Sequence, residues 1–239
     1  NLSITNGTCG LYLNGQTSVS LSNCDVKNNT GGGGIKISSC GRFIVNGGTI
    51  SGNSTTGRGG GICITDMPIA VSITDCTITG NTAATYGGGI DYTVSSGGTL
   101  NIRNSEISSN TATANSGGGI YADIGGDGSV TTKNLTLNNN HADSGSGGGI
   151  YATDSLNSFE MTGGTISGNS AKNGGAVSVN TKQGASPLLS GITIKNNTAT
   201  ENGGGIQVTT GKYLTIEDCT ISDNTAATYR GGIYAPGKL

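Results

Sequence analysis

Two tyrosines occupy equivalent places in neighbouring repeats of this chain. Tyr121 and Tyr151 each directly follow a Gly-Gly-Gly-Ile run, and Tyr12 and Tyr234 hold the same place in more distant repeats. If the run leads into a strand, the residue after Ile points away from the buried face, so the two rings should stack on an exposed sheet. Exposed Tyr provides flat, amphipathic contact area for a protein or a sugar. Tyr121 and Tyr151 are therefore the predicted ligand-binding residues, with simple cross-strand packing as the alternative.

Polar residues should continue this outward line. Asp91 and Gln207 stand at the same place in two other repeats. A row of polar and aromatic groups along a flat repeat face is suited to an extended partner. We therefore expect any binding to occur on this face.

Carboxylates could supply acid–base chemistry. Asp66, Asp123 and Asp154 follow the Gly-Ile segment of their repeats at three or four residues' distance. Enzymes that cleave polysaccharides cluster such groups on one face, with Arg or Lys or with a Ca²⁺ site. Asp66 and Asp154 lie three repeats apart, however, and the near-constant repeat length leaves no long loop to wall a cleft. We therefore expect no catalytic residues, with a carbohydrate-active enzyme as the alternative.

Histidine and cysteine offer little further chemistry. The only histidine, His141, has no triad partner spaced near it in the sequence. Cys24, Cys76 and Cys219 share one inward place of the repeat, and the nearest two should lie roughly 9.6 Å apart, too far for a disulfide. No pair of cysteines has the Cys-x-x-Cys spacing of a metal site. Free thiols are expected, with no metal and no cofactor.

The elements that must position these residues come from an internal repeat. A Gly-Gly-Gly-Ile motif and its variants recur every 27 to 30 residues, with the apolar residue at Ile35, Ile62, Ile90, Ile120, Ile150, Val177, Ile206 and Ile233. An apolar-x-x-Asn motif ends six to ten residues before each, at Asn29, Asn53, Asn81, Asn110, Asn140, Asn169, Asn197 and Asn224. Self-similarity at this period is the signature of a solenoid.

Each repeat predicts three short strands. Apolar residues alternate with polar ones before the Asn motif, within it, and after the glycines, as at Phe43/Val45, Ile50 and Ile62/Ile64. Period-two alternation between Gly, Asn, Ser and Thr turns is typical of short strands with one buried face. Parallel stacking prefers a right-handed path. The prediction is an all-β, right-handed parallel β-helix of about eight or nine coils, forming one domain over residues 1–239.

The turn residues have structural explanations. The position two residues before each of the recurring Ile or Val residues is always Gly, for example Gly33 and Gly118, which is expected where φ is positive or a backbone passes close by. Asn tolerates the left-handed region, and Asn side chains stacked at one place per coil can bond along the rod. These residues are thus predicted to be scaffold.

The two motifs together resemble the repeat of the polymorphic outer-membrane proteins, whose units carry Gly-Gly-Ala-Ile and Phe-x-x-Asn. The likeness extends from about residue 19 to residue 235 and is clear where Asn53 precedes residues 60–62, Asn81 precedes 88–90 and Asn169 precedes 175–177. In this chain Ile, Leu or Val replaces the Phe. The resemblance implies a β-helical passenger of a bacterial surface adhesin.

Composition narrows the remaining function classes. Gly accounts for 45 of the 239 residues, whereas aromatic residues make up 4% and charged residues 11%. The net charge is −2 and no basic run occurs, so nucleic acid is not an expected partner. No stretch approaches the roughly 20 apolar residues of a membrane helix, so we expect no membrane insertion of this segment.

A column of hydroxyl groups raises one more alternative. The strand of the Asn motif reads Thr-Ile-Ser or a close variant at Thr49, Thr77, Thr165 and Thr220, which resembles the flat array of ice-binding solenoids. Glu106 interrupts it, and Thr is common on solvated strands.

These observations together predict a non-catalytic repeat segment of a longer extracellular or cell-surface bacterial protein. It would serve as an adhesin or stalk and bind a host protein or a glycan. Its open coil edges would allow end-to-end stacking with further repeats.

Overall fold

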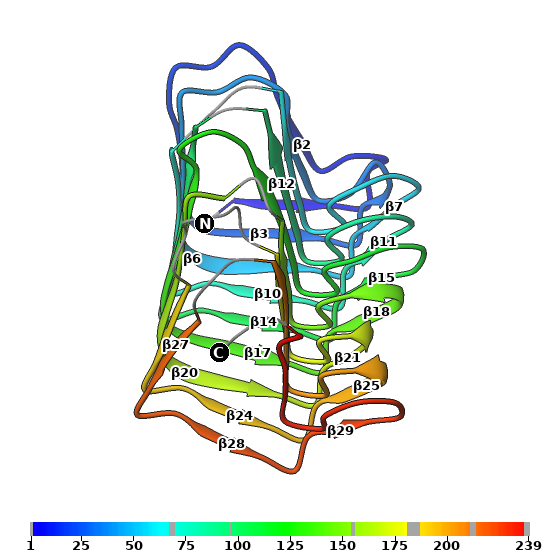
Figure 1. The fold of residues 1–239 in the computed structure, drawn as a ribbon. Helices are drawn as coiled ribbons and strands as arrows, with labels where there is room; N and C mark the ends of the chain where they lie inside the picture. Colours follow the sequence, from blue (N-terminus) through cyan, green and yellow to red (C-terminus); the bar gives the residue numbers. More distant parts are fainter. Residues whose placement is uncertain are drawn as a thin grey trace.

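The computed structural model describes residues 2–66, 70–95, 97–153, 156–180, 187–210 and 214–236, with the side chain of residue 210 left out. All regular structure in these residues is β-strand, arranged as three parallel sheets that run along one stack of coils (Figure 1). The expected all-β parallel solenoid is confirmed. One sheet has nine strands and another has eight, which agrees with the eight or nine coils expected.

The first sheet holds the strands on both sides of the turn that precedes the Asn motif. Its members are β1 (Ser3–Thr5), β3 (Val19–Lys27), β6 (Arg42–Ser51), β9 (Ala70–Thr74), β10 (Thr77–Thr79), β13 (Thr99–Arg103), β14 (Glu106–Ser108), β17 (Ser129–Asn138), β20 (Ser158–Ser167), β23 (Leu188–Ser190), β24 (Thr193–Lys195), β27 (Thr215–Glu217) and β28 (Thr220–Ser222).

The second sheet consists of short strands that directly follow the Asn motif. They are β4 (Thr30–Gly31), β7 (Ser54–Thr55), β11 (Thr82–Ala83), β15 (Thr111–Ala112), β18 (His141–Ser146), β21 (Ser170–Asn173), β25 (Thr198–Asn202) and β29 (Thr225–Ala226).

The third sheet is built from the strands that follow the glycines. They are β2 (Leu11–Leu13), β5 (Ile35–Ile37), β8 (Ile62–Thr65), β12 (Ile90–Val94), β16 (Ile120–Ile124), β19 (Ile150–Ala152), β22 (Val177–Asn180), β26 (Ile206–Thr210) and β30 (Ile233–Tyr234).

The division of each coil differs from the sequence-based prediction in one respect. The two strands expected around the Asn motif belong to one sheet, and in β6 and β17 they form one continuous strand. A further short strand, such as Thr82–Ala83 in β11, follows the Asn and was not predicted. Two residues are too few to show alternation, so only pairing with the neighbouring coils reveals this strand.

The core consists of equivalent apolar residues stacked from coil to coil. Ile62, Ile90 and Ile120 are partners in register on β8, β12 and β16, and all three are fully buried. Ile50, Ile78 and Ile107 form a matching stack on the first sheet. Because strands with one buried face alternate inward and outward residues, this register also fixes which side chains point away from the core.

Asparagine side chains form the predicted ladder through the interior. Asn81 Nδ2 donates to Asn110 Oδ1 at 3.0 Å and to Ile50 O at 2.9 Å, while the Asn81 backbone N–H also donates to Asn110 Oδ1 at 3.0 Å. The same pattern runs from Asn29 to Asn224. Both amide hydrogens and the amide oxygen are used, so these polar groups can be buried at little cost.

The ladder asparagines do not themselves adopt the left-handed conformation. Positive φ occurs one residue earlier in each coil, as at Asn28 (56°), Ser109 (54°) and Asn139 (53°). The left-handed residue turns the chain, and the following Asn bonds along the stack.

Close backbone approach explains the middle glycine of the repeat. A Cβ at Gly118 would lie 2.5 Å from the carbonyl oxygen of Gly148 and from the backbone N and C of His141. Positive φ occurs instead at the preceding glycine, Gly117 (75°), and among the middle glycines only Gly33 (85°) has it. Close backbone approach, and not a positive φ, therefore explains why residue Gly118 is a glycine.

Candidate functional site

The third sheet carries one continuous column of outward residues. Successive strands bring into register, in order, Tyr12, Lys36, Cys63, Asp91, Tyr121, Tyr151, Ser178, Gln207 and Tyr234. The alignment that the sequence predicted for the tyrosines, Asp91 and Gln207 is therefore confirmed. We call this row the outward column.

Tyr121 and Tyr151 stack as expected, but the pair does not form an open aromatic face. Their ring centroids are 5.4 Å apart with an interplanar angle of 11°. Tyr121 is only 7% exposed, because Tyr86 lies 4.5 Å from it, ring to ring, and Arg58 lies 5.4 Å from its ring centroid. Tyr151 is half-buried. The expectation that Tyr121 is exposed was wrong.

Turns between the second and third sheets cover part of the outward column. Figure 1 shows these turns as lobes beyond β7, β11 and β15. Arg58, in the turn after β7, reaches Asp91 on the next coil, and Tyr86, in the turn after β11, reaches Tyr121 on the next coil. Each of these two turns thus covers the outward residue one coil further along.

Asp91 is the most buried charged group of the column. Its carboxylate is 0% exposed and accepts hydrogen bonds from Arg58 Nε at 2.9 Å and Nη2 at 3.1 Å, and from Thr93 Oγ1 at 3.0 Å. Burial raises the pKa of Asp91 to about 6, although Arg58 opposes the shift. For Arg58, burial works against the charge, but hydrogen bonds to Asp91 and its charge outweigh this and raise the pKa. The guanidinium also lies 4.4 Å from the ring centroid of Tyr86.

At the N-terminal end of the outward column, the turn carries no side chain that could cover the sheet. The turn between β4 and β5 contains only Gly32, Gly33 and Gly34, so it lays no side chain over the column. Tyr12 and Lys36 are therefore exposed, although Cys63 itself is only 6% exposed. The result is an open groove of about 550 Å³, lined by Cys9, Tyr12, Gly31, Gly32, Lys36, Thr55, Thr56, Gly57, Arg58, Cys63 and Thr65. We call it the N-terminal groove. This groove was not predicted from the sequence, although the glycine run and the short six-residue step from Asn29 to Ile35 were signals of it.

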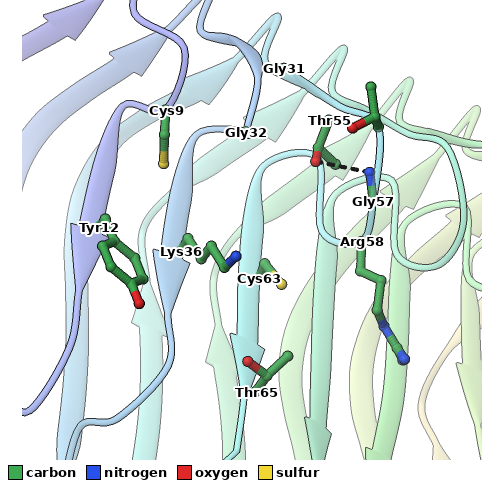
Figure 2. A pocket seen from close by; sticks show the side chains of 11 residues that line it. Cys9, Tyr12, Gly31, Gly32, Lys36, Thr55, Gly57, Arg58, Cys63 and Thr65 are labelled. Atoms are coloured by element: carbon green, nitrogen blue, oxygen red, sulfur yellow. Dashed lines mark hydrogen bonds between the residues drawn. The ribbon is translucent and has the colours of Figure 1, made fainter.

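The N-terminal groove presents an aromatic ring, a cation and two thiols. Figure 2 shows Lys36 on the strand between those of Tyr12 and Cys63, with Arg58 on the far side. Tyr12 is 55% exposed, and Lys36 Nζ lies 5.8 Å from its ring centroid. Burial raises the pKa of Cys9, and burial together with the charge of Asp91 raises the pKa of Cys63 to about 12. Both thiols are therefore neutral at physiological pH.

A second groove lies beside Arg58 on the same sheet. It has a volume of about 590 Å³ and is lined by Arg58, Thr65, Asp66, Thr93, Val94, Ser95, Asp123 and Gly125. It brings together Asp66 and Asp123, two of the carboxylates singled out in the sequence; the third, Asp154, lies outside the described residues. Asp123 accepts a hydrogen bond of 2.7 Å from Thr153 Oγ1. We call this the acidic groove.

His141 has two partners that the sequence did not reveal. Its Nε2 lies 2.6 Å from Asp143 Oδ1, and its Nδ1 contacts Ser170 Oγ on the next coil. His141 and Asp143 are exposed, and neither they nor Ser170 line the two grooves. The arrangement has the residue types of a catalytic triad, but it stands apart from both grooves, and its His and Asp are exposed.

The cysteines are all free thiols. Cys24 and Cys76 are buried, and Cys76 Sγ donates to Thr74 O at 3.0 Å. Within the described residues no three His, Cys, Asp or Glu side chains gather as a metal site would require.

The hydroxyl column of the first sheet is also in register. Thr49 pairs with Thr77, Thr77 with Glu106 and Glu106 with Thr136. The column then continues through Thr165, Thr193 and Thr220. Glu106 therefore interrupts the array within the sheet, as its sequence position indicated.

The repeat, the parallel register and the family comparison all indicate the same fold. The family model described as a right-handed beta helix region matches residues 1–183 and 154–235, nearly the whole chain. This chain belongs to the right-handed β-helix family. No curated protein and no solved structure shows a significant match to it. The family supplies the handedness of the β-helix, whereas the likeness to polymorphic outer-membrane proteins stays a resemblance.

The described part of this β-helix contains no helix with the length and apolar character needed to cross a membrane.

Proposed function

We propose that this β-helix is a non-catalytic binding segment of an extracellular or cell-surface bacterial protein, acting as an adhesin towards a host glycan or protein. The observation that carries the proposal is the N-terminal groove, an open concavity with an exposed Tyr12 ring and the ammonium group of Lys36. Its volume of about 550 Å³ falls in the range of small-ligand sites.

The scaffold suits such a role. The Asn ladder and the stacked Ile columns hold successive coils in a fixed register, so groups on neighbouring strands keep their spacing. Binding sites held on strands are positioned better than sites on free loops. The resemblance to outer-membrane adhesin repeats supports the same proposal.

An array of host proteins and glycans probed with the purified chain would test this function. We expect binding that is weakened by Tyr12→Ala, since the exposed ring can be removed without disturbing the core. Tyr229→Ala is the matched control, because Tyr229 is 57% exposed at the other end of the chain. An array without any bound partner would refute the adhesin proposal. Labelling of intact bacterial cells with an antibody against the chain would test the surface location.

The acidic groove favours a second candidate, a carbohydrate-active enzyme. Asp66, Asp123 and Arg58 line one concavity, which is the combination of carboxylates and a cation that glycoside cleavage uses. Depolymerisation assays on a panel of polysaccharides would decide. Turnover that is lost in both Asp66→Asn and Asp123→Asn would establish the enzyme and replace the adhesin proposal.

The hydroxyl column supports ice binding less well. Because Glu106 stands within the column, the flat array is broken near its middle. A thermal-hysteresis measurement would establish ice binding if it gave activity well above that of an unrelated β-protein.

A further inference from the structure

The charge of the N-terminal groove indicates what kind of ligand it would accept. Lys36 and Arg58 are its charged lining residues, and no Asp or Glu of the described residues lines it. Both thiols are neutral. The groove is therefore positively charged, although the chain as a whole carries a net charge of −2. A negatively charged group is therefore favoured in the groove.

Lys36 is the cation available to a ligand. No carboxylate of the described residues forms an ion pair with its ammonium group, which instead lies near the ring of Tyr12. Arg58 is less available, because its Nε and Nη2 already donate hydrogen bonds to Asp91 and Thr93. A ligand anion would thus gain a charge-assisted hydrogen bond from Lys36 without breaking an existing pair.

The floor of the groove argues against a peptide strand as the ligand. The floor is the face of the third sheet, and within it the backbones of β2, β5 and β8 are already bonded to one another, as in Leu11 N to Gly34 O at 2.9 Å and Ile35 N to Gly61 O at 2.8 Å. Among these three strands, only the outer edge of β2, the terminal strand of this sheet, has no partner strand in the described part of the chain. A peptide lying on this face therefore finds no free backbone, and strand addition here could occur only at the edge of β2 and not on the floor of the groove. Side chains alone can recognise the ligand, and these offer a ring, an ammonium group and the hydroxyls of Thr55, Thr56 and Thr65.

We propose that the N-terminal groove binds a sugar that carries a carboxylate or sulfate group. The acidic group would accept hydrogen bonds from Lys36, an apolar face of the ring would lie on Tyr12, and the threonines would meet sugar hydroxyls. Tyr12, Lys36 and Cys63 stand on successive strands, so the floor is on the order of 10 Å long, enough for a short acidic oligosaccharide. This inference rests on the proposed adhesin function and specifies its ligand.

Paired sugars that differ only in the acidic group provide the test. Sialyllactose would be compared with lactose, and a sulfated lactose would show whether sulfate replaces carboxylate, each by isothermal titration at two salt concentrations. We expect the acidic sugars to bind, lactose to bind at least tenfold more weakly, and affinity to fall as salt rises.

Lys36→Gln should weaken binding of the acidic sugar about tenfold and remove most of its salt dependence, while leaving the weak binding of lactose unchanged. Lys195→Gln is the matched control, since Lys195 is also exposed and lies on the first sheet, away from the groove. Lys36 is exposed, so its replacement leaves the core intact.

Different results would overturn the acidic-sugar inference and the adhesin proposal. Equal affinity for lactose and sialyllactose, or an unchanged affinity in Lys36→Gln, would overturn the acidic-sugar inference while leaving an adhesin for neutral glycans. Binding of a host protein through Lys36 without any sugar would also overturn it, and would assign the groove to a protein partner. No binding to any sugar or protein would overturn both.

Discussion

Replacing one ladder asparagine should show how much the Asn ladder contributes to stability. Asn110 accepts hydrogen bonds at Oδ1 from the backbone N–H and the Nδ2 of Asn81, both at 3.0 Å, and its own Nδ2 donates to Ile78 O at 2.9 Å and to Asn140 Oδ1 at 3.0 Å. In Asn110→Ala, two buried donors on Asn81 and the carbonyl of Ile78 lose a partner. The Oδ1 of Asn140 still accepts from the backbone of residue 110 at 3.1 Å.

The expected cost follows from these lost partners. Leaving a buried polar group unsatisfied costs about 1–3 kcal/mol, so three groups at the lower half of that range give about 3–6 kcal/mol. This is a large share of the 5–15 kcal/mol that typically stabilises a folded domain. Asn110→Leu fills the space with an apolar side chain but leaves the same groups unpaired, so it should be nearly as destabilising.

Urea unfolding would measure the loss, with Asn157→Ala as the control because the Asn157 side chain is exposed. Because solenoids can open locally, hydrogen exchange at the Asn81 amide should be followed as well. We expect this amide to exchange faster in both Asn110 variants. A free energy of unfolding within about 1 kcal/mol of the parent, together with full protection of the Asn81 amide, would refute the reasoning.

Three further predictions concern the glycine, the buried ion pair and the stacked rings. Gly118→Ala should lower the free energy of unfolding by several kcal/mol through backbone clash rather than φ strain, and a loss below about 1 kcal/mol in urea unfolding would contradict this. Burial raises the pKa of Asp91 to about 6, so the folded protein binds its proton more tightly than the unfolded chain. The free energy of unfolding should therefore fall by up to about 3 kcal/mol as pH rises from about 4 to 6, and Asp91→Asn should abolish this slope in pH-dependent urea unfolding. Arg58 remains a third exposed and can be solvated in that variant. Replacing Tyr121 and Tyr151 together by Ser should lower the melting temperature and leave ligand affinity unchanged, since Tyr121 is covered and neither ring lines the N-terminal groove; a stable double variant that binds more weakly would restore these tyrosines as ligand-binding residues.

The sequence contained enough to predict the solenoid, the Asn ladder and the alignment of the tyrosines, Asp91 and Gln207 in the outward column. Strand parity and a period of 27 to 30 residues are properties of the chain itself. Once parallel stacking is accepted, they determine which residues point inward and which residues of neighbouring coils meet. Tyr121 and Tyr151 could therefore be paired correctly from their positions alone.

Whether an outward residue is exposed was decided only by the tertiary structure. Arg58 covers Asp91 from 33 residues earlier in the chain, and Tyr86 covers Tyr121 from 35 residues earlier, whereas an all-glycine turn leaves the groove beside Lys36 open. The placement of Asp66 and Asp123 in one groove, and the contact of His141 with Ser170, depend in the same way on how turns and strand ends of different coils lie together. Alternation within a strand specifies a direction for each side chain, but it carries no information about which turn folds over that side chain. That contact is set by side-chain packing and charge between coils. The sequence therefore predicted which residues point outward, while the tertiary structure decided which of them are exposed.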